Sequence, residues 1–111
     1  MDVSIEKPNK AVLDNSDVLT CQSTGLPVPN MRWDIIDGET KVWHLGTGAQ
    51  LAVRQMCLYR QWMWDLGSSS TTVRCTATRL NYTAYSDVNV SLSRSESDKI
   101  VCGMFVYCVV Q

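Results

Sequence analysis

The chain is built from short runs in which apolar and polar residues alternate, and Gly, Pro, Asn, Asp and Ser separate these runs. In an extended strand successive side chains point to opposite faces, so each such run has one face for a core and one for solvent. No stretch keeps a helical apolar period. We predict strands at 3–6, 11–13, 17–22, 31–36, 41–45, 71–78 and 85–92, and we also interpret 50–56 and 58–64 as extended. Many short strands with regular turn signals predict an all-β sandwich or barrel.

Alternation also predicts which side chains face the core. Pro8 lacks an amide donor and interrupts the first two runs, so we expect a split first strand at a sheet edge. The inward positions predicted within the later strands are Leu19, Cys21, Trp33, Ile35, Val73, Cys75, Ala77, Val88 and Val90.

The length of 111 residues, 45% of them hydrophobic, suits one domain with one core. We expect that domain at 1–93, followed at 94–111 by a polar linker and an apolar tail that contains cysteine. The apolar run 100–110 is shorter than the roughly 20 residues that span a bilayer. The tail is therefore a strand, part of a truncated membrane segment or the start of another domain. The first residues contain no apolar leader, so we expect a processed or excised fragment.

Three residues carry a resemblance to a known family. Cys21, Trp33 and Cys75 stand in the order and at the separations typical of immunoglobulin domains, and the segment 25–29, Gly-Leu-Pro-Val-Pro, resembles the turn between the second and third strands of I-set domains. The chain is thus similar to I-set or C2-like immunoglobulin domains over residues 3–92. The resemblance implies a two-sheet Greek-key sandwich in which a Cys21–Cys75 disulfide bridges the core beside a buried Trp33. Val73 departs from the pattern, because the family usually has tyrosine there.

Segments 17–22 and 73–77 look like the corresponding strands of receptor tyrosine kinase ectodomains, including the neurotrophin receptors. This similarity implies a non-catalytic recognition module of a cell-surface receptor or adhesion protein, with a protein ligand or co-receptor as its partner. Five cysteines favour an oxidising compartment, and Asn81 and Asn89 begin two N-glycosylation sequons. We therefore expect an extracellular or cell-surface glycoprotein. The alternative is an immunoglobulin domain that acts as a spacer without touching a ligand.

Charge and chemistry exclude other classes. Ten basic and eleven acidic residues nearly cancel, so we expect no binding of nucleic acid, and contact with a membrane only through missing parts of the parent chain. His44 has no nucleophile context, and Asp34, Asp37 and Glu39 are interpreted as caps around a turn. We predict no enzyme activity, no metal and no cofactor.

One segment has the composition of an interface. Trp and Arg dominate binding hot spots and Met adapts to a partner's shape, and these types, with Tyr, gather at Arg54, Tyr59, Arg60, Trp62, Met63 and Trp64. We predict a partner surface there, where Cys57 would also suit a covalent homodimer. The alternative is that Trp62 and Trp64 share one face and belong to the core. The sequence leaves open how Cys57, Cys102 and Cys108 pair.

Overall fold

The computed structural model describes residues 2–14, 16–25, 27–37, 41–56 and 70–92. Within these ranges the chain forms strands and one short 3-10 helix. The elements are β1 (Val3–Glu6), β2 (Val18–Ser23), β3 (Asn30–Asp37), β4 (Lys41–Thr47), β5 (Gln50–Ala52), η1 (Val53–Met56), β6 (Ser70–Arg79) and β7 (Tyr82–Ser91).

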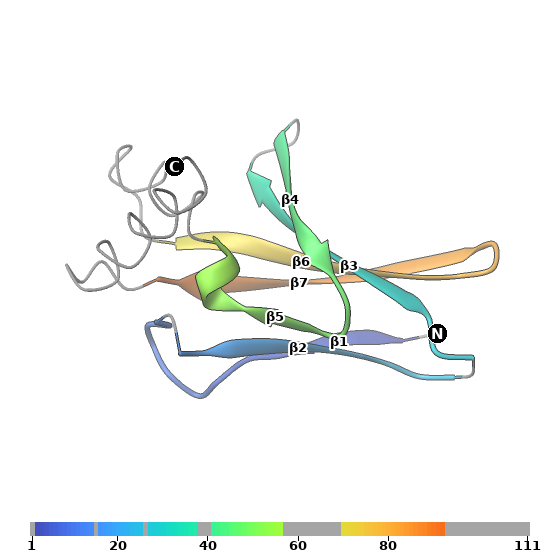
Figure 1. The fold of residues 1–111 in the computed structure, drawn as a ribbon, viewed down its shortest axis with the longest axis horizontal. Coiled ribbons are helices and arrows are strands. Elements are labelled where there is room, and N and C mark those ends of the chain that lie inside the picture. Colours follow the sequence, from blue (N-terminus) through green and yellow to red (C-terminus); the bar gives the residue numbers. More distant parts are fainter. Residues whose placement is uncertain (1, 15, 26, 38–40, 57–69, 93–111) are drawn as a thin grey trace, which may run out of the picture.

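The strands form two antiparallel sheets that lie face to face (Figure 1). One sheet has the order β1-β2-β5 and the other the order β4-β3-β6-β7. The predicted all-β, two-sheet sandwich is confirmed. The four-stranded sheet is the larger layer, and its β6–β7 hairpin projects at one end of the molecule (Figure 1).

The core lies between the sheets and follows the period of two in the sequence. Every predicted inward residue of β2, β3 and β6 is buried, and in β7 Val90 is buried while Val88 is half-buried against the core. The buried apolar residues are Leu13, Leu19, Cys21, Met31, Trp33, Ile35, Leu51, Val53, Met56, Val73, Cys75, Ala77, Val90 and Leu92.

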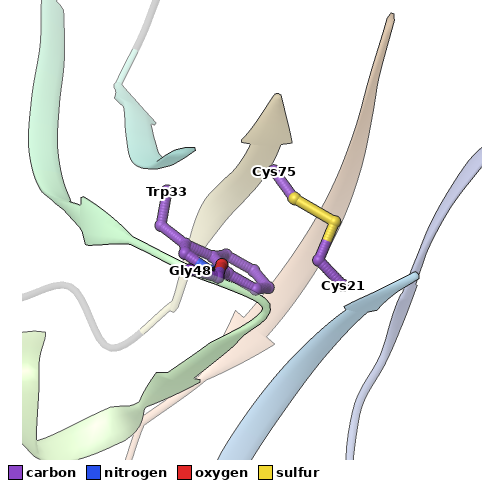
Figure 2. Close-up of a disulfide and its surroundings, with 4 residues drawn as sticks. All are labelled: Cys21, Trp33, Gly48 and Cys75. Atoms are coloured by element: carbon purple, nitrogen blue, oxygen red, sulfur yellow. Dashed lines mark hydrogen bonds between the residues drawn. A yellow bond between two sulfur atoms is a disulfide. The ribbon is translucent and has the colours of Figure 1, made fainter. Parts of the chain in front are cut away.

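A disulfide between Cys21 and Cys75 joins the two sheets across this core (Figure 2). Trp33 is completely buried beside it, and its indole Nε1 donates a hydrogen bond to the carbonyl oxygen of Gly48 at 2.8 Å. Gly48 has a φ of 111°, in the region that favours glycine, so the turn between β4 and β5 brings this carbonyl to the indole without steric cost. The indole thus has both apolar packing and a hydrogen-bond partner.

The first strand is split into two parts, as predicted from the position of Pro8. β1 pairs with β2, whereas Leu13 forms a parallel bridge to Leu92, beyond the end of β7. The predicted strand 11–13 is wrong in extent, because only Leu13 makes a bridge. In the loop that follows, the hydroxyl of Ser16 donates to Asp14 and is the main reason that the pKa of this carboxyl falls to about 2.

The extended structure predicted for 50–56 is wrong beyond Ala52. The chain there turns into η1, in which Val53 and Met56 are both completely buried. Apolar residues three apart lie on one face of a 3-10 turn, so this geometry buries both. The side-chain oxygen of Gln55 accepts the N–H of Ala52 at 2.8 Å, which helps the strand to end.

The β6–β7 hairpin is longer than the sequence predicts. Its strands pair without interruption from Ser70–Ser91 to Arg79–Tyr82, so β7 begins three residues before the predicted start of 85–92. A two-residue turn, Leu80-Asn81, closes it. Leu80 has a φ of 54° and is 90% exposed. A leucine in this left-handed region is strained, and its side chain gains no burial that would compensate.

We therefore expect Leu80→Gly to stabilise the domain by about 0.5–1 kcal/mol. Removing the backbone strain of a left-handed leucine stabilises the fold by about 1–2 kcal/mol. The greater conformational freedom of glycine in the unfolded chain lowers this gain by about 0.4–1 kcal/mol. Urea unfolding measures the change. Leu80→Ala is the matched control, because it shortens the side chain and keeps the strain. An equal gain in both variants would contradict the prediction.

Candidate functional site

The candidate site is the solvent face of the four-stranded sheet, which we call the outer face. Since Trp33, Ile35, Val73 and Cys75 point into the core, the residues between them point outward. The strand register brings together on this face His44 of β4, Arg32, Asp34 and Ile36 of β3, Thr72, Arg74 and Thr76 of β6, and Tyr85, Asp87 and Asn89 of β7.

Acidic and basic side chains alternate in a row across the sheet. Opposite residues in neighbouring strands lie side by side on one face, and the register sets His44 opposite Asp34, Asp34 opposite Arg74, and Arg74 opposite Asp87. Each carboxylate therefore lies next to a basic side chain on the same face. The row pairs its charges across strands and gives the outer face a defined electrostatic pattern.

An irregularity in β4 makes this row complete. The register shifts between Trp33 and Asp34, so Gly46 pairs with Trp33 but His44 pairs with Asp34, and Leu45 is the extra residue of a β-bulge. Leu45 packs against the core, and the bulge keeps His44 on the same face as Asp34. If the register of Trp33 and Gly46 continued without a bulge, Leu45 would lie opposite Asp34 and His44 would point toward the core.

Asp34 is the most constrained residue of the face. It is only 5% exposed, although it lies on the solvent side of its strand. The Nε of Arg32 donates to its two carboxylate oxygens at 3.1 and 3.2 Å, and the Nδ1 of His44 lies 3.2 Å from one of them. The interpretation of Asp34 as a turn cap is wrong, because the residue lies within β3. A buried carboxyl group is tolerated where such hydrogen-bond partners compensate its loss of solvent.

Arg74 links the other half of the row. Its Nε and Nη2 donate to the two oxygens of Asp87 at 2.7 and 3.0 Å, and this hydrogen bonding raises the pKa of the guanidinium. The same guanidinium lies 4.0 Å from the centre of the Tyr85 ring. Bidentate pairing and ring stacking hold a planar group in one orientation. Tyr85 itself remains 60% exposed, so it is a positioned aromatic side chain that faces solvent.

An open hollow of about 560 Å³ adjoins this face beside Arg32 and Thr76. Val28 and Pro29 of the turn before β3 and Gly48 of the turn after β4 also line it. The hollow therefore joins hydroxyl, guanidinium and apolar groups at the end of the outer face nearest these turns.

The described part of the partner surface predicted from the sequence does not belong to the outer face. Arg54 is exposed on η1, whereas Tyr59, Arg60, Trp62, Met63 and Trp64, with Cys57, lie outside the described residues, as do Cys102 and Cys108. Of the two sequon asparagines, Asn81 is exposed in the hairpin turn. Asn89 is exposed on the outer face, where its side-chain oxygen accepts a hydrogen bond from the Thr72 hydroxyl at 2.6 Å.

Sequence reasoning missed the outer face itself. The polar residues between the inward positions could have indicated this face. Arg32 and Asp34 precede and follow the inward Trp33, and Arg74 precedes the inward Cys75. Such residues are usually interpreted only as solvent-facing. Which of them meet depends on strand order.

His44 and Asp34 make a pair that orients the imidazole, and in the described ranges no hydroxyl or thiol is hydrogen-bonded to His44. The same ranges contain no group of three His, Cys, Asp or Glu side chains that would hold a metal ion. Among these residues there is also no helix with the length and apolarity needed to cross a membrane.

Comparison of the chain with protein-family models, with curated proteins and with solved structures gives no match.

Proposed function

We propose that this chain is an immunoglobulin-like domain of a cell-surface receptor or adhesion protein, and that it recognises a protein ligand through the outer face without catalysing a reaction. The observation that carries the proposal is Tyr85, which is 60% exposed and held by Arg74. Tyrosine and arginine are enriched among the residues that dominate protein interfaces. An exposed aromatic ring that is already oriented loses little conformational entropy on binding.

Two further observations support this proposal. The Cys21–Cys75 disulfide is compatible with an oxidising compartment, where receptor and adhesion ectodomains fold. The charges of the face are paired in fixed positions, so a partner meets a defined pattern of potential. Such patterns provide specificity and steer association.

The sequons fit this proposal in different ways. A glycan on Asn81 would lie at the hairpin turn, whereas one on Asn89 would lie on the outer face beside Thr72. A module that binds through this face is therefore expected to carry its glycan on Asn81.

Binding to an array of purified extracellular domains tests the proposal, with the chain presented as a tetramer to increase avidity. For any ligand found, we expect Tyr85→Ala to weaken the affinity at least about tenfold, as loss of a hot-spot side chain does. The matched control is Gln22→Ala, which changes an exposed residue of β2 in the other sheet.

Equal affinity of both variants and the unchanged chain would contradict binding through the outer face. Absence of any ligand from a correctly folded tetramer would favour the alternative of a spacer domain.

A further inference from the structure

We propose that two copies of this chain associate by pairing their β7 strands edge to edge, antiparallel, around a twofold axis through Ser86. This inference goes beyond the proposed function, because it concerns the backbone edge of the sheet and holds whatever the outer face recognises.

β7 is an edge strand with an open side. It pairs with β6 over all ten of its residues, and no other described strand is its partner in that sheet. β1 lies beside β7 but pairs with β2. Of the backbone hydrogen bonds found outside the strand pairs of the described residues, only the one from the N–H of Leu13 to the carbonyl of Ser91, at 2.8 Å, reaches β7.

That hydrogen bond identifies which backbone groups point away from β6. The carbonyl of Ser91 points to Leu13 and therefore not to β6, and in an antiparallel ladder this direction alternates from residue to residue. With no register shift in β7, both the N–H and the carbonyl of Thr83, Tyr85, Asp87 and Asn89 point to the open side. All four residues are exposed.

The side chains agree with this assignment. Residues of an antiparallel pair that do not exchange backbone hydrogen bonds have the closer side chains. Three pairs between β6 and β7 are linked by side-chain hydrogen bonds: Thr72 with Asn89 at 2.6 Å, Arg74 with Asp87 at 2.7 Å, and Thr78 with Thr83 at 3.5 Å. Each contains one of the β7 residues assigned to the open side, as the assignment requires.

β7 lacks the features that normally protect a sheet edge. Edges are kept from pairing by short strands, bulges, proline and lysine. β5 has three residues and β1 has four, with Lys7 and Pro8 directly after it, and the pairing of β4 contains a bulge. β7 has ten regular residues without lysine or proline, and its one charged residue, Asp87, is paired with Arg74.

Self-complementarity favours a second copy as the partner. With the axis at Ser86, Tyr85 lies opposite the partner's Asp87, and Thr83 lies opposite the partner's Asn89, so all four open residues find partners. The tyrosine hydroxyl is a donor and the carboxylate an acceptor, so this register also matches the side chains. An axis at Asp87 would set two carboxylates opposite each other, which is unfavourable.

Sedimentation equilibrium of the purified, unglycosylated chain measures the association, and we expect a reversible dimer. Thr83→Pro removes an N–H that does not bond to β6, so the fold should persist. The dissociation constant of the dimer should rise at least about tenfold, because each dimer loses two intermolecular hydrogen bonds. Thr83→Val is the matched control, since it keeps the N–H and should dimerise like the unchanged chain.

A crosslink tests the register and does not depend on how Thr83→Pro folds. In Ser86→Cys the new thiols face each other across the axis, so oxidation should join the two introduced thiols, one from each copy, as identified by peptide mapping. In Ala84→Cys the thiols lie opposite Val88 and should not link to each other. A chain that stays monomeric up to its solubility limit, or Ala84→Cys linking as readily as Ser86→Cys, would overturn the proposal.

Discussion

Replacing both Cys21 and Cys75 by alanine is expected to lower the free energy of unfolding by about 4 kcal/mol. The two residues are 54 positions apart, so the disulfide closes a long loop and removes much of the conformational freedom of the unfolded chain. Both are also buried between the sheets, and alanine fills that space less well. A loss of this size is a large share of the stability of a small domain.

Chemical denaturation followed by tryptophan fluorescence measures the loss. Cys21→Ser with Cys75→Ser is the comparison, because it buries two hydroxyls in an apolar core and should cost more than alanine. A double alanine variant within about 1 kcal/mol of the unchanged chain would show that the bond adds little to this fold.

Trp33→Ala is the second large effect, with an expected loss of about 3–5 kcal/mol. Trp33 is completely buried beside the disulfide, and its removal leaves a cavity between the sheets and a Gly48 carbonyl without its donor. Trp33→Phe separates the two contributions, since it keeps most of the apolar packing and loses the hydrogen bond. That variant should lose about 1–3 kcal/mol.

Thermal and denaturant unfolding of both variants, with Tyr82→Ala as a control, provide the measurement. Tyr82 is 55% exposed in the hairpin, so its truncation should change stability by less than about 1 kcal/mol. If Trp33→Ala cost no more than Tyr82→Ala, the indole would have no special part in the core.

The site is less predictable from the sequence than the core. The alternation around Trp33 and Cys75 indicates which residues face inward, and each is buried. Nothing local indicates that Asp34 is nearly buried, because His44 joins Arg32, the partner within β3, only when β4 pairs with β3 through a bulge. The turn interpretation failed because Asp34 lies within β3, where its side chain meets Arg32 of the same strand and His44 across the sheet.

Alternation along the chain therefore indicates most of the strand-forming segments and the inward phase of their side chains, because both depend on a period of two. The positions of Cys21, Trp33 and Cys75 follow directly from the sequence. The strand order, the row of acidic and basic side chains across the outer face and the open edge of β7 emerge only in the folded chain, because each depends on which distant strand supplies the hydrogen-bond partner. The turn at η1 depends on the burial of Val53 and Met56 in the core. Because pairing joins residues far apart in the chain, the same local pattern is compatible with several neighbours and registers, and packing of the whole core selects one.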